Sequence, residues 1–175
     1  ENIAAKWGIT REDQDRLAVE SHNRAERATQ SGVFKDQIVP VTLKSKKGDV
    51  QYATDEHFRP GATMEDLAKL KPAFLKENGT VTAGNASGIN DAAAAVVLME
   101  AGAAKARGAK PLARLVAYAH AGVDPKYMGI GPVPATQLAL KKAGLTVNDL
   151  DVIEANEAFA AQACAVTRDL GLDPA

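Results

Sequence analysis

Apolar positions in the first third of the chain follow a helical spacing. Residues 10–31 carry a narrow apolar stripe among charged residues, so we expect a helix that lies on a surface with its charges in water. Thr10 and Asp13 have the spacing of a capping box, which marks the start of this helix. Gly32 follows the last residue of the pattern and is a suitable helix end.

A hairpin and a short helix are predicted next. Residues 38–43 and 50–54 have strand-like composition and are separated by a Lys-Gly-Asp turn, which is typical of a β-hairpin. Thr63 then has the character of a helix cap, and Pro72 limits the helix that it begins to about Leu70.

The second half of the chain alternates between strand-like and helical segments. The strand-like segments are residues 112–119 and 152–155, and the helical ones are residues 135–143 and 158–170. This alternation favours an α/β fold with a parallel or mixed sheet covered by helices. An entirely apolar run, residues 92–99, fits either a buried strand or a buried helix, because periodicity does not separate the two.

Composition excludes several classes of partner. The 175 residues carry a formal net charge of −1, so there is no field of one sign to attract nucleic acid or an anionic membrane. The longest apolar run is too short to cross a bilayer. The single cysteine, Cys164, cannot form an internal disulfide, which favours a reducing, cytoplasmic location. Because the chain starts without methionine and stops just after a helical pattern, we expect a piece of a longer protein.

The segment Glu154–Ala160 is one candidate site. Here a predicted buried strand ends and a helix begins, which is where ligands bind in open α/β sheets. Asn156 falls at the predicted helix N-cap, so its amide either caps the helix or helps to hold a developing oxyanion. Glu157 fits a base, a favourable partner of the helix dipole or a structural hydrogen bond.

A second candidate site is the loop of small polar residues from Thr82 to Gly88. Its lack of bulk allows a thin ligand to lie against the backbone, with the Ser87 hydroxyl available to an amide-bearing chain, or else the loop is a tight structural turn. It is not a phosphate-binding P-loop, because no Gly-Lys-Ser/Thr sequence follows.

The three histidines have no partners at metal-ligand spacing, so no metal site is expected. His22, on the charged helix, is expected to be solvated. Cys164 lies among alanines with nothing nearby to lower its pKa, which favours a packing role. Arg59, beside Pro60 and Gly61, reaches either a phosphate or only water.

The two candidate segments together resemble thiolases. Asn156-Glu157-Ala158-Phe159 is similar to the Asn-Glu-Ala-Phe motif of that family, and Thr80–Asp91 is similar to the segment that leaves its loop domain. The resemblance covers essentially the whole chain and is strongest to the biosynthetic acetoacetyl-CoA thiolases. It implies a partial thiolase-like α/β fold: residues 1–88 would be the later part of the loop domain, residues 89–110 the last strand and helix of the N-terminal half, and residues 111–175 the first part of the C-terminal half.

The resemblance also implies a reaction. The parent enzyme would condense two acetyl-CoA molecules to acetoacetyl-CoA and CoA, or carry out the reverse thiolysis, through a cysteine acyl-enzyme. Coenzyme A and acetyl-CoA would be substrates, and no cofactor would be bound permanently. The family's two catalytic cysteines and its catalytic histidine have no counterpart here, and Cys164 matches neither cysteine. The chain alone is therefore expected to be inactive.

The supporting residues do have counterparts. Asn156 matches the asparagine that holds an oxyanion-hole water, and Ser87 matches the serine that contacts the pantetheine arm of CoA. Arg59 lies near the family's contacts to the CoA nucleotide. The apolar residues that would line the acyl and pantetheine tunnel are Phe74, Ala83, Ala158 and Phe159. The resemblance implies a homodimer or homotetramer. The alternative is a non-catalytic CoA-binding or structural fragment.

Overall fold

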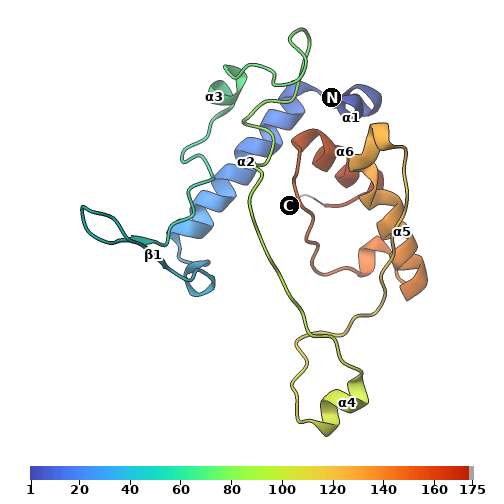
Figure 1. Cartoon of the computed structure of the whole chain (residues 1–175). Helices are drawn as coiled ribbons and strands as arrows, with labels where there is room; N and C mark the ends of the chain where they lie inside the picture. The colour runs from blue at the N-terminus through green and yellow to red at the C-terminus, as the bar shows by residue number, and fades with distance from the viewer. Residues whose placement is uncertain (174–175) are drawn as a thin grey trace. The chain divides into compact units, whose positions relative to one another are not determined.

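The computed structural model describes residues 1–173 (Figure 1). These residues form two units. The first consists of Glu1–Gly88 and Ala155–Ala165, and the second consists of Ile89–Glu154 and the stretch from Val166 onward. All the candidate site residues belong to the first unit. The division of the chain into three thiolase segments, at residues 88 and 110, stays a prediction.

The longest element is the helix α2, Arg11–Gln30, and its predicted start is confirmed. The Thr10 hydroxyl accepts a hydrogen bond from the Asp13 backbone N–H, and the Asp13 carboxylate accepts one from the Thr10 N–H, so two free donors of the first turn are satisfied. The buried face of α2 differs from the expectation. It consists of Gln14, Asp15 and Ala18, so a carboxylate is buried where only solvated charges were expected.

Two small apolar clusters hold the first unit together. One joins Ala18 of α2 to Ala62 and Leu67, and Leu67 lies in the short helix α3, Met64–Ala68. The other joins Ala4 of α1, Asn2–Trp7, to Ile9 and to Ala161 of α6, Ala160–Leu170. Because these apolar contacts are few and small, polar contacts contribute much of the order in this unit.

The predicted hairpin is confirmed. Strands β1, Val41–Leu43, and β2, Val50–Tyr52, pair antiparallel with Thr42 opposite Gln51. All six residues are exposed. A single 3₁₀ turn, Lys35–Gln37, precedes β1.

In the second half, α5 forms over the predicted residues 135–143, and three further short helical segments form beside it in the sequence. Their bounds are α4, Ala101–Ala106; the 3₁₀ segment Pro125–Ile130; α5, Pro132–Ala143; and the 3₁₀ turn Val147–Asp149. Glu100 caps α4 by accepting from the Ala103 N–H at 2.8 Å. Gly144 ends α5 in the left-handed conformation, φ 70°, which favours glycine.

The predicted strands of the second half are not formed in residues 1–173. Residues 112–119 and 152–155 have no regular structure, and neither do residues 92–99, whose pattern fitted a buried strand or a buried helix. Most of their apolar side chains are exposed, and Val97 and Leu112 show 89% and 101% of their surface. A strand requires a hydrogen-bonded neighbour, and the only sheet in the described part of the chain is the β1–β2 pair. The expected strands are therefore absent because they have no partner strand, and sequence pattern alone does not determine which strands pair.

Within residues 1–173, no helix has the length and apolar character needed to cross a membrane.

The cap of α2 gives a first test. Thr10→Ala removes the hydroxyl that accepts from Asp13, and should cost about 1 kcal/mol of local stability, equivalent to about fivefold faster hydrogen exchange in the first turns of α2. Thr10→Ser keeps the hydroxyl and is the control. Equal exchange rates in the wild type and the alanine variant would contradict a stabilising role for the cap.

Candidate functional site

The two candidate segments lie side by side in the first unit. Ala86 and Phe159 form an isolated antiparallel bridge. The Ser87 N–H donates to the Ala158 carbonyl at 3.0 Å, and the Ala160 N–H donates to the Asn85 carbonyl at 2.9 Å. Backbone hydrogen bonds thus connect positions more than 70 residues apart in the sequence.

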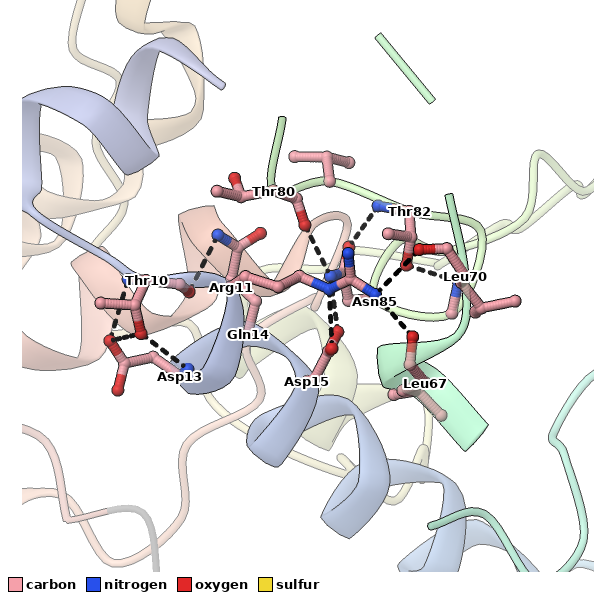
Figure 2. A network of polar contacts seen from close by, with 12 residues as sticks. Thr10, Arg11, Asp13, Gln14, Asp15, Leu67, Leu70, Thr80, Thr82 and Asn85 are labelled. Atoms are coloured by element: carbon pink, nitrogen blue, oxygen red, sulfur yellow. Dashed lines mark hydrogen bonds and ion pairs between the residues drawn. The ribbon is translucent and has the colours of Figure 1, made fainter. Parts of the chain in front are cut away.

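The loop from Thr80 to Asn85 is held by the Asn85 side chain, which is 3% exposed (Figure 2). Its Oδ1 accepts from the Thr82 N–H at 2.8 Å, and its Nδ2 donates to the Thr80 carbonyl at 3.0 Å. The same Nδ2 donates to Asp15 Oδ1 of α2 at 2.9 Å. One amide therefore fixes the shape of the loop and attaches it to the helix.

Asp15 also connects the loop to α3. Its other oxygen accepts from Arg11 Nε at 2.7 Å, and the Asp15 side chain is 3% exposed (Figure 2). The Arg11 guanidinium continues to the carbonyls of Leu67 and Leu70 at the end of α3, where a positive charge is favourable. The buried charge thus has an ion-pair partner and an amide donor, as its burial requires.

Gly84 shows what the small residues of this loop do. A Cβ added here would lie 2.5 Å from Leu70 Cδ1 and 3.1 Å from Leu67 Cγ. Gly84 is buried, whereas its neighbour Ala83 is exposed. The missing side chain therefore admits two leucines of the protein itself, which supports the structural turn at this position.

Glu1 secures the start of the same loop. Its carboxylate accepts from the N–H groups of Thr80 and Val81 and from the Thr80 hydroxyl, at distances of 2.8–3.1 Å. Burial opposes ionisation, but these hydrogen bonds outweigh it and hold the pKa of the Glu1 carboxyl below its ordinary value.

The expected position of Asn156 at a helix N-cap is wrong. Helix α6 begins at Ala160, and Asn156 lies in an exposed, irregular segment four residues earlier. With no paired strand before it, the chain does not turn directly from strand to helix here. Glu157 next to it makes a structural hydrogen bond, since it accepts from the Ser21 hydroxyl of α2 at 2.6 Å.

The other candidate residues form pairs. The Phe74 and Phe159 rings lie 6.5 Å apart between centroids, tilted by 60°, and remain 66% and 41% exposed. Ala158 is half-buried and bonds through its backbone to the exposed Ser87. Arg59 Nη2 donates to the Ala83 carbonyl at 3.4 Å. Asn156 is thus the only candidate with no contact described to another.

Several contributing residues were not predicted. His22 is half-buried rather than solvated, and its Nδ1 accepts from the Arg59 N–H at 3.2 Å. His57 accepts through Nε2 from the Gly88 N–H at 3.2 Å. The roles of Asp15 and Asn85 were also missed. The i,i+4 spacing of Arg11 and Asp15 was visible in the sequence, but nothing local shows that this pair would be buried.

In residues 1–173, no group of three or more His, Cys, Asp or Glu side chains is arranged to hold a metal ion. Cys164 lies within α6, with its Sγ 3.9 Å from the Asp13 carbonyl.

Two family models match the chain. The model of the thiolase N-terminal domain matches residues 1–102, and that of the thiolase C-terminal domain matches residues 109–175. The chain belongs to the thiolase family. Its fold is accordingly a partial thiolase-like α/β fold.

Individual thiolases are similar over the entire chain. The beta-ketothiolase BktB of Cupriavidus necator is 69% identical over 175 residues, and an acetyl-CoA acetyltransferase of Rhizobium meliloti is 59% identical over 174 residues. These matches cover 100% and 99% of this chain but only 44% of each relative. The chain therefore spans less than half the length of the curated relatives it matches.

Solved thiolase structures agree with this assignment. The crystal structure of the Bacillus anthracis acetyl-CoA acetyltransferase has a TM-score of 0.89 at 53% identity, covering 98% of this chain and 43% of the other. Human mitochondrial 3-ketoacyl-CoA thiolase has a TM-score of 0.86 at 47% identity, with the same coverage.

Two ion pairs on α2 of this thiolase provide a matched comparison. Asp15→Ala leaves the Arg11 guanidinium and the Asn85 amide without their acceptor, and should lower the free energy of unfolding by about 3–5 kcal/mol. Glu12→Ala removes a pair of the same i,i+4 spacing to Arg16, in which both side chains are about 70% exposed, and should cost less than about 1 kcal/mol. Urea denaturation of the full-length protein measures both, and equal losses would contradict the role given to Asp15.

Proposed function

We propose that the protein containing residues 1–175 is a thiolase acting on acyl-CoA substrates. It would condense two acetyl-CoA molecules to acetoacetyl-CoA and CoA, or catalyse the reverse thiolysis, through a cysteine acyl-enzyme. The observation that carries the proposal is the bridge between Ala86 and Phe159. It joins the two segments whose sequences resemble the CoA-binding and oxyanion-hole parts of thiolases.

The exposed face beside this bridge has the chemistry that a CoA thioester requires. Ser87 offers a hydroxyl to the amides of pantetheine, and the Phe74–Phe159 pair offers apolar surface to its methylenes. Ala83 and Ala158 add little bulk beside them. Arg59 supplies a cation for a phosphate of the nucleotide.

The covalent steps would be carried out by other residues of the parent protein. In the proposal, Asn156 holds a water in the oxyanion hole, and its exposed position leaves its amide available for that role. Cys164 is not assigned a covalent step. The length of the relatives, more than twice that of this chain, supports placing the nucleophile and the acid–base residues outside residues 1–175.

The names of the relatives are compatible with two ranges of acyl-chain length in the substrate. Acetyl-CoA acetyltransferase indicates a two-carbon acyl group, whereas beta-ketothiolase and 3-ketoacyl-CoA thiolase are broader terms. We propose acetoacetyl-CoA as a substrate because acetyl-CoA acetyltransferases recur among the relatives. We also propose that the protein is cytoplasmic and that it forms a homodimer or homotetramer. Light scattering of the full-length protein would test the oligomeric state.

The decisive experiment is thiolysis by the full-length protein. Acetoacetyl-CoA and a longer 3-ketoacyl-CoA are each mixed with CoA, and loss of the substrate is followed. Turnover of acetoacetyl-CoA is the expected result. Binding of CoA without turnover of either substrate would overturn the proposed reaction in favour of a non-catalytic CoA-binding protein.

Asn156 is tested separately. Asn156→Ala should lower kcat by about 10²–10³ if its amide supports an oxyanion hole. Asn148→Ala, which removes another exposed asparagine in the 3₁₀ turn Val147–Asp149, should leave kcat unchanged. Wild-type kcat in the Asn156 variant would remove this residue from the mechanism.

Ser87 should influence binding rather than chemistry. Ser87→Ala removes a hydroxyl but keeps the backbone N–H that bonds to Ala158, so the bridge should survive. Loss of one hydrogen bond to pantetheine should raise KM for CoA about fivefold with kcat nearly constant. An unchanged KM would contradict a contact between this hydroxyl and the substrate.

A further inference from the structure

A short loop, residues 57–62, lies beside the proposed CoA surface and is attached to α2 by three polar contacts. His22 Nδ1 accepts from the Arg59 N–H at 3.2 Å, and Glu26 Oε2 accepts from the Gly61 N–H at 2.7 Å. Asn23 Nδ2 donates to the Ala62 carbonyl at 3.3 Å. The backbone that carries the Arg59 guanidinium is therefore positioned by one face of the helix.

The other end of this loop is attached to the segment that carries Ser87. His57 Nε2 accepts from the Gly88 N–H at 3.2 Å, and Arg59 Nη2 donates to the Ala83 carbonyl at 3.4 Å. The His22 imidazole thus connects α2 to this loop. The His57 imidazole connects the loop to Gly88, the residue that follows Ser87.

Both imidazoles are acceptors in these contacts, and this sets their protonation state. A protonated histidine has two N–H donors and no acceptor. Protonation of His22 would therefore place an N–H against the N–H of Arg59, and protonation of His57 would do the same against Gly88. The neutral tautomers follow directly: His22 carries its proton on Nε2, and His57 carries its proton on Nδ1.

The surroundings of His22 favour the neutral form. Burial is the largest cause that lowers its pKa below the ordinary 6.5, and the charges of Arg59 and His57 act in the same direction. A hydrogen bond to the Gly84 backbone and the carboxylate of Glu157 oppose them without cancelling them. Glu26, one turn further along α2, is bonded to the Gly61 N–H.

Charged residues of both signs are neighbours of His57 in the sequence. Its own backbone N–H donates to Asp55 Oδ1 at 3.1 Å, and Glu56 lies next to it in the sequence. Arg59 and His22 are the positive or protonatable groups nearby. Protonating both histidines would thus place up to three positive charges around one short loop.

We propose that neutral His22 and His57 are positioning residues that hold Arg59 and the Ser87–Gly88 segment for CoA binding, and that protonation of either releases them. This inference rests on the proposed function for its ligand, although the histidine contacts themselves do not. It makes CoA affinity depend on the protonation of two residues that are not assigned a contact with the substrate.

The lowered pKa of His22 also determines the direction in which folding stability changes with pH. Because the pKa of His22 is lower in the folded state, the unfolded chain binds more protons between that value and 6.5. Stability in this window therefore rises with pH, and it is lost as the pH falls below 6.5.

The contacts are tested first without CoA. Nitrogen-15 NMR of the histidine side chains in the full-length protein, titrated from about pH 8 to pH 5, reports tautomer and protonation together. The expected result is the Nε2–H tautomer for His22, the Nδ1–H tautomer for His57, and half-protonation of His22 below pH 6.5. Either histidine in the opposite tautomer, or half-protonation of His22 above pH 6.5, would overturn the proposal whether or not the protein binds CoA.

The effect on CoA is tested by calorimetry at about pH 8 and about pH 6. His22→Asn and His57→Gln keep an oxygen acceptor near Nδ1 and Nε2 respectively, but do not titrate. The double variant should bind CoA with wild-type affinity at the higher pH, and at the lower pH should bind about fivefold or more tightly than the wild type. Protonation of the CoA phosphates affects every variant alike, so the comparison between variants removes it.

Three further variants complete the experiment. His22→Ala and His57→Ala lack the acceptors and should weaken CoA binding at both pH values, whereas His120→Gln, an exposed histidine of the other unit, should behave as wild type. An identical pH dependence in the wild type and the Asn/Gln double variant would overturn the proposed role in binding. No CoA binding by any variant at either pH would overturn the proposed function, while the NMR titration would still decide the histidine contacts.

Discussion

The buried pair of Asp15 and Asn85 is the interaction on which the candidate site depends. Asp15 takes a hydrogen bond from Asn85 and an ion pair from Arg11, and the Asn85 backbone carbonyl accepts from the first residue of α6. The loop, helix α2, the end of α3 and the start of α6 are thus connected through Arg11, Asp15 and Asn85. The apolar clusters of this unit are small, so this polar network specifies the arrangement rather than supplementing a large core.

The division between buried and exposed residues follows from this polar network around Asp15 and Asn85. The residues proposed to contact substrate, such as Ser87, Phe74 and Arg59, are exposed, whereas the residues that hold their backbone, such as Asp15, Thr82 and Asn85, are buried. An exposed binding surface on irregular backbone needs such support, because the loop has little regular hydrogen bonding of its own. The sequence of the loop serves both purposes, with Gly84 and Asn85 facing inward and Ala83 and Ser87 facing solvent.

The sequence predicted features that depend on neighbours a few residues apart. The capping box at Thr10, the cap at Thr63 and the glycine after α5 are local signals, and the corresponding helices form. The strands expected at residues 112–119 and 152–155 require partners distant in the sequence, and they are unpaired in the described part of the chain. The error at Asn156 has the same origin, because its predicted N-cap position assumed that a strand ended beside it.

The candidate site was predictable in its motifs but not in its contacts. Ser87 and Phe159 were identified by resemblance, and their segments do meet at the Ala86–Phe159 bridge. His22 was expected to be solvated because its helix is rich in charge, and that inference treated the helix as a whole. The faces of one helix can differ in burial. His22 lies three and four residues beyond Val19 and Ala18, on the side of α2 that packs against residues 59–84. There its Nδ1 accepts a hydrogen bond from the Arg59 N–H. A charged helix can therefore carry a half-buried histidine, and only the tertiary contact reveals its burial.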